Sequence, residues 1–299
     1  MIEAISLCKR LDDTVVLDKL NLKVKRGSIY GLIGSNGAGK STLLNILSGV
    51  YRPDGGEAKI NGRKIYENNI LKGKTAYITD DPFYFNSSTV DEMAAYLNRI
   101  YKSFDMDKYR EISSMFPIDT KKKINTFSKG MRRQVSIILA LSQCPEILLC
   151  DESFDGLDPV IRQMVKRLFV SEVASRGMTI VISSHNLREL EDVCDHVGIM
   201  NKGKIIIERS LSDLQGNVSK IQIACEGEIP KLPEEFKVLH TSNIGRVHTL
   251  IVRGNPEKAV ELLTAKEEHA IVDVIPLSLE EIFIYETGGV DYEVKDILF

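Results

Sequence analysis

The sequence of 299 residues is poor in the features that mark secreted or membrane-spanning proteins. Its five cysteines are odd in number and scattered, without a C-x-x-C pair, which argues against a disulfide framework and a zinc site. The amino terminus turns acidic too early for a signal peptide. The longest apolar runs, such as VSIILAL at 135–141, fall far short of a bilayer span. We therefore expect a cytoplasmic protein that reaches a membrane only through another chain.

The composition also lacks a strong charge of either sign, and it contains no internal repeat or low-complexity tract. The formal net charge is -3, with 43% hydrophobic and 27% charged residues, which is an ordinary globular profile. Such a charge gives no overall attraction to nucleic acid, so no nucleic-acid partner is expected. The length allows one large domain or two of ordinary size.

A glycine-rich segment carries the strongest chemical signal. Residues 34–41 fit G-x-x-x-x-G-K-[ST] in full, between a predicted strand at 27–34 and a predicted helix at 41–50. Glycines let backbone N–H groups curl around a phosphate, and the helix start adds unpaired donors. Lys40 would neutralise the β- and γ-phosphates, and the Ser41 hydroxyl would bind Mg²⁺. A Rossmann dinucleotide loop has different spacing and does not explain the Lys-Ser pair. The predicted nucleotide-binding residues are Gly34, Ser35, Asn36, Gly37, Ala38, Gly39, Lys40, Ser41 and Thr42.

The strand predicted at 146–152 ends in two carboxylates, Asp151 and Glu152. Asp151 can lie beside a metal ion through a water ligand, and Glu152 is positioned to orient or deprotonate an attacking water. A pair of carboxylates at a strand end is as often structural when it stands alone. The phosphate loop upstream favours the catalytic interpretation.

A second predicted anion site lies where a helix begins after Phe127. Ser128 looks like an N-cap, and Gly130 leaves the backbone exposed, so this helix start offers N–H groups and a positive dipole end. Arg132 and Arg133 follow in the next turn. One nucleotide rarely needs two phosphate cradles in one chain, so this one is assigned to a neighbouring chain's ATP. A capped and solvated helix is the alternative for this segment taken alone.

Together these motifs resemble the nucleotide-binding subunit of an ABC (ATP-binding cassette) transporter, over roughly residues 1–215. FSKGM stands where the family usually has LSGGQ, so Ser128 and Gly130 match while Lys129 and Met131 depart. ISSHN places His185 as the switch histidine, which the resemblance implies contacts the γ-phosphate and steadies the water. FDGLD corresponds to the D-loop, with Asp155, Gly156, Leu157 and Asp158.

Two positions depart from the family in the predicted nucleotide site. The aromatic residue that stacks on adenine in the family corresponds to Leu11, and losing that stack should cost on the order of 1 kcal/mol of binding. The Q-loop glutamine aligns with Asp80, or Asp81 if the alignment slips by one. A carboxylate at this place can still bind Mg²⁺, so the predicted metal ligands are Ser41, Asp151 and Asp80.

The expected fold is α/β, a P-loop ABC-type ATPase core with an antiparallel β subdomain and a helical subdomain, plus a small C-terminal α+β domain. We place the ATPase domain at 1–213, with the helical subdomain at about 83–145, and the accessory domain at 214–299. The segment PLSLEEIFIYETGG is similar to the ending of many subunits paired with ABC-2-type permeases. Its pattern predicts a helix with a capping box made by Ser278 and Glu281.

The resemblance implies two subunits that meet head to tail around ATP and Mg²⁺, with Glu152, His185 and Lys40 as the catalytic residues. They would drive a permease on a separate chain at the cytoplasmic face of the membrane. An identical chain and a paralogue both fit as the second cassette. The aromatic segment 81–85 could contact the permease or pack in the core. A non-transport ABC ATPase and a nucleotide sensor with little turnover remain alternatives.

Overall fold

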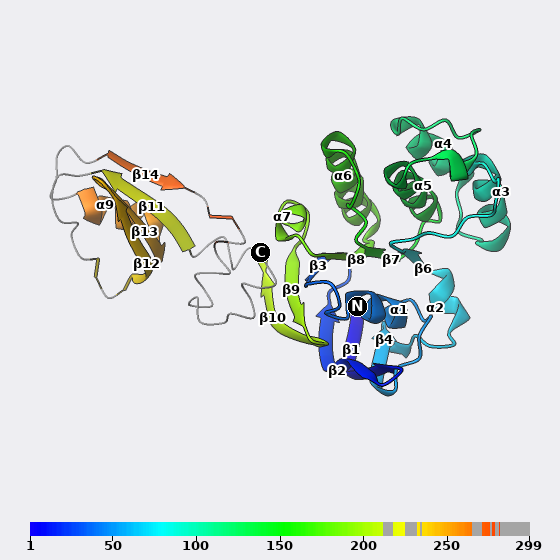
Figure 1. The fold of residues 1–299 in the computed structure, drawn as a ribbon, viewed down its shortest axis with the longest axis horizontal. Helices are drawn as coiled ribbons and strands as arrows, with labels where there is room; N and C mark the ends of the chain where they lie inside the picture. Colours follow the sequence, from blue (N-terminus) through cyan, green and yellow to red (C-terminus); the bar gives the residue numbers. More distant parts are fainter. Residues whose placement is uncertain are drawn as a thin grey trace. The chain divides into compact units, whose positions relative to one another are not determined.

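A computed structural model of the protein divides the chain into two compact units, Met1–Glu208 and Arg209–Phe299 (Figure 1). The sequence places the corresponding boundary a few residues later, after residue 213. No helix among the described residues is long and apolar enough to cross a membrane. The structure describes residues 1–211, 218–224, 232–233, 235–264, 271–275, 277–278 and 281.

The centre of the first unit is a six-stranded sheet with the strand order β10-β9-β3-β8-β7-β6. The five strands from β9 to β6 are parallel, and β3, β7 and β8 are buried along their whole length. Burial on both faces explains why these strands are continuous apolar runs. The strands are β3 (Ile29–Ile33), β6 (Thr75–Ile78), β7 (Ile147–Asp151), β8 (Thr179–Ser184), β9 (His196–Asn201) and β10 (Lys204–Ser210).

Helices cover both faces of this sheet. Figure 1 shows α6 (Pro159–Arg176) and α7 (Leu187–Leu190) on one face, and α1 (Lys40–Leu47) on the other. The sequence predicts a helix that starts at Pro159 and has Gly177 past its end. Both limits are confirmed, because Pro159 opens α6 and Gly177 ends it in the left-handed region with φ 63°. Because the parallel strands end at the same edge, the segments after β3, β7 and β8 lie together there.

The segment NLRELEDVCD predicts a helix over residues 186–195, and this prediction is wrong in its length, since α7 ends at Leu190. The reason is the pairing of Asp195 with β3. The Asp195 backbone N–H donates to the Ile29 carbonyl at 2.8 Å, and its carboxylate accepts from the Ile29 N–H at 2.7 Å. A helix continued to residue 195 would not allow this pairing. The segment HVGIMNKGKIIIE predicts a hairpin over residues 196–208, and it is present as β9 and β10, with left-handed residues Lys202 and Gly203 in its turn.

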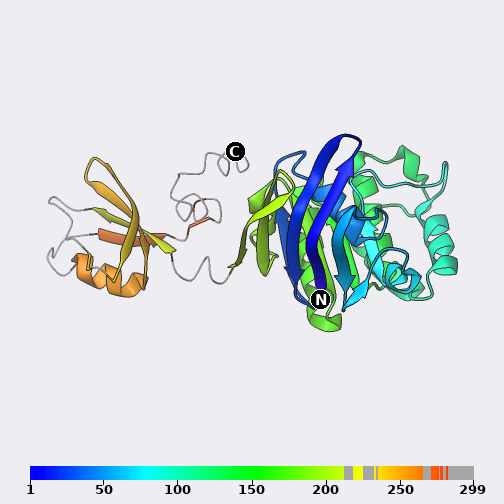
Figure 2. The same ribbon diagram turned by 90° about the horizontal axis from the view of Figure 1, so that it is seen from below.

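A second, four-stranded sheet has the order β2-β1-β4-β5 and lies across the α1 side of the first (Figure 2). The sequence predicts two strands with a charged turn between them at 14–24, but the structure has one strand, β2. The backbone forms a bulge at Lys19, with φ 48°. The bulge accommodates Asp18 and Lys19, and β2 stays paired with β1 on both sides of it. The Asn61-Gly62 pair predicts a hairpin turn, which is confirmed between β4 and β5. The strands are β1 (Ile2–Leu11), β2 (Thr14–Val24), β4 (Gly55–Ile60) and β5 (Arg63–Lys64).

The helical subdomain lies beside β6 at the end of the large sheet. Thr89 and Glu92 form a capping box at the start of α3, and Asp105 and Ser128 cap α4 and α5 with their side-chain oxygens. The helix α5 is buried over most of its length, which joins this subdomain to the core. The helices of this part of the chain are α2 (Asn69–Gly73), α3 (Val90–Ile100), α4 (Met106–Met115), the 3-10 turn η1 (Ile124–Thr126) and α5 (Lys129–Ser142).

The second unit contains an antiparallel sheet with the order β12-β13-β11-β14. Helix α9 (Pro256–Thr264) packs on one face through Ala259 and Leu263. The predicted closing helix lies largely outside the described residues. Its capping contact is present, because the Glu281 N–H donates to Ser278 Oγ and the Ser278 N–H donates to Glu281 Oε2. The strands are β11 (Val218–Ala224), β12 (Lys237–Ile244), β13 (Val247–Arg253) and β14 (Ile271–Ile275).

Candidate functional site

The glycine-rich loop between β3 and α1 is closed around the side chain of Lys40. The ammonium of Lys40, only 5% exposed, donates to the Gly34 carbonyl at 2.6 Å and to the Ser35 carbonyl at 3.2 Å. A Cβ on Gly34 would lie 2.5 Å from the Met200 carbonyl oxygen, so the loop passes where only glycine fits. Gly39 begins α1 at φ 105°, which also requires glycine.

The carboxylate of Asp151 is held at the end of β7 by two hydroxyl groups. It is 4% exposed, and it accepts from Ser183 Oγ at 2.6 Å and from the Tyr77 hydroxyl at 3.5 Å. Burial, together with the negative charge of Asp151, raises the pKa of Tyr77 well above its usual value. Sequence reasoning missed Tyr77 and Ser183, whose only signal is that each belongs to a strand adjacent to β7.

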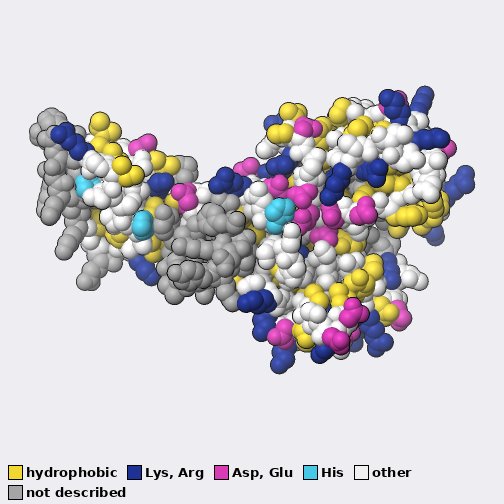
Figure 3. All heavy atoms as spheres, viewed as in Figure 1, with side chains coloured by type: hydrophobic (Ala, Val, Ile, Leu, Met, Phe, Trp, Pro, Cys, Tyr) yellow, Lys and Arg dark blue, Asp and Glu magenta, His cyan; other side chains and the backbone are white. Residues whose placement is uncertain are grey.

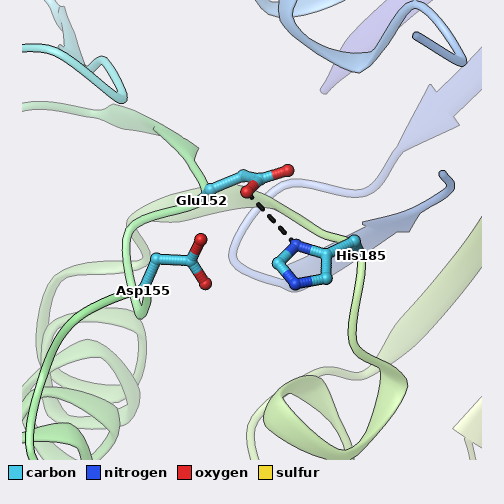
Figure 4. A group of neighbouring side chains, drawn as sticks. All are labelled: Glu152, Asp155 and His185. Carbon is cyan, nitrogen blue, oxygen red and sulfur yellow. Dashed lines mark hydrogen bonds and ion pairs between the residues drawn. The ribbon is translucent and has the colours of Figure 1, made fainter. Parts of the chain in front are cut away.

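Glu152 connects the phosphate loop to the segment after β8. Its Oε1 lies 3.4 Å from Lys40 Nζ, and its Oε2 lies 3.2 Å from His185 Nδ1 (Figure 4). The residue has φ 48°, a left-handed conformation that is unfavourable for a glutamate. Its backbone N–H donates to the Ser183 carbonyl and hydroxyl oxygens, which holds this conformation in place. Strained residues of this kind concentrate at functional sites.

Asp155 completes this group. Donor atoms of Glu152, Asp155 and His185 all lie within 4.8 Å of one another, and Figure 4 shows the Asp155 carboxylate turned toward the other two side chains. The sequence places Asp155 in the D-loop but does not bring it to Glu152. Figure 3 shows acidic side chains gathered around a histidine in the middle of this unit, beside cationic side chains of the helical subdomain.

The segment Ser128–Met131 lies at the start of α5, with Ser128 Oγ accepting from the Met131 N–H at 3.3 Å. The prediction that Gly130 leaves the backbone exposed needs correction. A Cβ there would lie 2.3 Å from the Gly156 carbonyl oxygen, so Gly130 packs directly against the D-loop. Arg132 also turns inward, donating to the carbonyls of Phe127 and Asn125. One surface of the chain thus combines the start of α5 with the D-loop.

Asp80 contacts two cationic side chains of helix α5. Its Oδ1 accepts from Arg133 Nη2 at 2.6 Å and lies 3.3 Å from Lys129 Nζ. Burial would raise the pKa of this carboxyl group, but the hydrogen bonds and charges of Arg133 and Lys129 outweigh it and hold the pKa below its usual value. These contacts favour a structural role for Asp80, in which it anchors the start of α5. They give less support to its predicted role as a metal ligand.

The two remaining sequence candidates lie on the surface. Leu11, which takes the place of the family's adenine-stacking aromatic, ends β1 and is 37% exposed. Phe83 is 80% exposed and Phe85 44%, which argues against the core-packing interpretation of this segment. The Phe85 ring makes edge contacts with Phe83 and with Tyr96 of α3.

Comparison with known proteins also relates this chain to the ATP-binding subunits of ABC transporters. Residues 17–155 match the family model described as ABC transporter. The ABC transporter ATP-binding protein YtrB of Bacillus subtilis is 30% identical over 290 residues, 97% of this chain and 99% of that protein. The bacitracin transport ATP-binding protein BcrA of Bacillus licheniformis is 32% identical over 301 residues, 97% and 98% of the two chains.

A solved ATP-binding subunit of an ABC transporter covers 72% of this chain and 92% of its own, with a TM-score of 0.66 and 27% identity. The fold agrees with this structural match, and the two relatives are matched over nearly their full lengths. The chain therefore belongs to the family of ABC transporter ATP-binding proteins and is an ABC-type ATPase.

Proposed function

We propose that the protein binds Mg²⁺-ATP at the Gly34–Thr42 loop and hydrolyses it with Glu152 as the general base, in a head-to-tail dimer that drives a permease on a separate chain. The observation that carries this proposal is the position of the Glu152 carboxylate between Lys40 and His185. A general base must lie within hydrogen-bond reach of the proton that it removes. The Glu152 carboxylate lies 3.4 Å from the ammonium that would bind the γ-phosphate, so a water attacking that phosphate would stand within its reach.

Each of these three side chains has a separate task. The Lys40 ammonium lies inside the loop, where it would neutralise phosphate charge. Glu152 would take the proton of the attacking water, and His185, 47% exposed and 3.2 Å from Glu152, would orient that water and contact the γ-phosphate. Most of the catalysis would then come from positioning and charge, as is usual in phosphoryl transfer.

The oxygen donors at this edge fit a magnesium ion. Ser41 is the exposed residue in the otherwise buried first turn of α1, and the Asp151 carboxylate is fixed by two hydroxyl groups at the end of β7. Mg²⁺ prefers such oxygen ligands and usually keeps several waters. When bound, the ion would neutralise charge on the phosphates.

The start of α5 supports a shared site. Ser128, Lys129 and Gly130 present a helix N-terminus, and Gly130 is packed against Gly156, so this surface and the D-loop would meet a second cassette together. The second cassette is either another copy of this chain or a related subunit. The phosphates in the Gly34–Thr42 loop of one subunit would contact Ser128–Met131 of the other.

Mixing two inactive variants tests the shared site. Lys40→Ala inactivates the phosphate loop and Ser128→Arg blocks the α5 surface, so each homodimer should be inactive. A mixed dimer retains one intact site, and hydrolysis should recover to about a quarter of the wild-type rate, because half of the dimers are mixed and each has one of two sites. No recovery by variants that exchange subunits would contradict a homodimeric shared site.

A groove between the core and the helical subdomain is the proposed permease site, at the cytoplasmic face of the membrane. It has a volume of about 590 Å³, and Tyr77, Pro82, Phe83, Tyr101 and Leu139 are among its lining residues. An exposed aromatic surface beside a groove is typical of an interaction site. Co-purification with wild-type protein and with aromatic-to-charged variants tests this assignment.

A further inference from the structure

Glu189 is a buried carboxylate that the proposed function does not use. It lies in α7, directly after the turn that carries His185, and it is 7% exposed. Its Oε2 accepts from Ser184 Oγ at 2.9 Å, and its Oε1 lies 3.3 Å from Arg162 Nη1. A buried carboxylate is costly unless it is paired, and both oxygens of Glu189 are paired. The contacts of Glu189 with Ser184 and Arg162 therefore fix the structure around the turn that carries His185.

The first partner, Ser184, fixes the turn before the histidine. Its hydroxyl oxygen accepts from the Asn186 N–H at 2.9 Å while donating to Glu189, so one hydroxyl closes the turn around His185. Its carbonyl accepts from the Gly34 N–H at 3.3 Å, at the start of the phosphate loop. Ser184 is itself 2% exposed. Its hydroxyl has two acceptors within reach, the Asn186 carbonyl oxygen at 3.1 Å and the Glu189 carboxylate at 2.9 Å, and the negative charge of Glu189 favours the second.

The second partner, Arg162, reaches the D-loop. It lies in the first turn of α6, and its Nη2 donates to the Leu157 carbonyl at 3.4 Å. Leu157 follows Asp155 by two residues, and Asp155 faces the same space as His185 (Figure 4). Glu189 therefore stands between the D-loop and the histidine turn.

The ring of His185 has little packing of its own. The side chain is 47% exposed, and its ring lies 3.2 Å from Glu152. A ring this exposed takes its position mainly from the backbone of its turn. We propose that Glu189 is a positioning residue that orients His185 through Ser184, and that Arg162 links this orientation to the D-loop. The inference rests on the proposed catalytic role of His185.

A neighbouring ion pair provides a matched control. Lys166 Nζ lies 3.4 Å from Asp192 Oδ2, and this pair joins α6 to the residues just after α7, as the Arg162–Glu189 pair joins α6 to α7. Its hydrogen bond does not involve Ser184 or the histidine turn. Asp192 is 67% exposed, and Asp192→Asn therefore removes a more exposed connection between the same two segments without touching the proposed path.

Steady-state ATP hydrolysis by the full chain tests the inference, with Glu189→Ala, Glu189→Gln and Asp192→Asn each made in the wild-type and in a His185→Ala background. Glu189→Ala should lower kcat about tenfold or more with little change in KM, since a misplaced catalytic group costs turnover more than binding. Glu189→Gln should restore most of kcat, because its amide oxygen can still accept from Ser184 Oγ. Asp192→Asn should change kcat less than about twofold.

Comparing Glu189→Ala in the wild-type and His185→Ala backgrounds shows whether Glu189 positions His185 or only stabilises the fold. If Glu189 acts through His185, Glu189→Ala should change kcat less than about twofold once the histidine is absent, because coupled residues are not additive. An equal loss in both backgrounds, or an equal loss with Asp192→Asn, would overturn the inference. Full activity of His185→Ala alone would instead refute the proposed role of the histidine. Thermal melting of each variant, with Glu189→Gln as the conservative one, separates unfolding from these outcomes.

Discussion

Removing the carboxylate of Asp80 should destabilise the start of α5, because Arg133 depends on it for compensation. The Arg133 side chain is 1% exposed, and its two terminal nitrogens donate to Asp80 Oδ1 at 2.6 Å and to the Thr79 carbonyl at 2.7 Å. Its Nε has no hydrogen-bond partner in the described structure. Asp80→Ala would leave a buried guanidinium group without a counter-charge.

The loss of unfolding free energy expected for each substitution depends on how exposed Asp80 and Lys129 are. Losing a hydrogen bond to a charged group costs about 1.5–3 kcal/mol, and Asp80 is 54% exposed, so water can replace part of the contact. We therefore expect Asp80→Ala to lower the free energy of unfolding by about 2 kcal/mol. Lys129 is 69% exposed and lies at 3.3 Å, so Lys129→Ala should cost less than about 0.5 kcal/mol.

Urea unfolding followed by far-ultraviolet circular dichroism measures these differences, because the chain has no tryptophan to report by fluorescence. A double-mutant cycle with Arg133→Met isolates the pair, since the substitution removes the charge and keeps an apolar side chain. The pKa of Asp80 is lowered in the folded state, so its contribution is present above its unfolded value of 3.8. It should be constant from pH 8 to about pH 5 and fall as the pH drops through the lower folded-state pKa.

Equal effects of Asp80→Ala and Lys129→Ala would refute this reasoning, because they would show that the burial of Arg133 does not set the cost. A coupling energy near zero between Asp80 and Arg133 would have the same meaning.

Three further predictions concern other parts of the chain. Phe83→Asp with Phe85→Asp should abolish permease co-purification while leaving ATP affinity unchanged, and equal co-purification of variant and wild type would remove the proposed interface. Gly130→Ala should reduce ATP hydrolysis at least about tenfold, because its Cβ would lie 2.3 Å from the Gly156 carbonyl oxygen; wild-type turnover would show that the two segments separate easily. Burial raises the pKa of the Cys150 thiol to about 12, so iodoacetamide should modify the native protein at its partly exposed cysteines and spare this one, as peptide mass spectrometry can show.

The sequence predicted those parts of the site whose chemistry is local. The phosphate loop needs a strand, glycines at fixed spacing and a helix start, and all three are contiguous between Ile29 and Leu47. The Asp151-Glu152 pair was likewise readable because it directly follows a buried strand. The local sequence of such segments determines their backbone conformation, so the structure contains them at the predicted positions.

The rest depends on contacts between residues far apart in the chain. Gly130 against Gly156 and Asp80 against Arg133 are set by how the helical subdomain packs on the core, which no local pattern reports. One signal was present for the contact of Asp80 with Lys129, its other cationic partner. The Q-loop position carries an acid and the adjacent family motif carries an unexpected cation, Lys129, and such opposite departures fit a compensating pair. The bulge at Lys19 was missed because charged residues inside a strand look like a turn.

ATP turnover by purified wild-type protein beside Glu152→Gln tests the central claim most directly. The account predicts that Glu152→Gln lowers kcat by about a hundredfold or more, since general base catalysis contributes at least that much. It also predicts that this variant retains Mg²⁺-ATP and elutes as an ATP-dependent dimer in size-exclusion chromatography. Turnover within a few-fold of the wild type would contradict the assignment of Glu152 as the base. The chemistry attributed to the Lys40–Glu152–His185 group would then have to come from other residues.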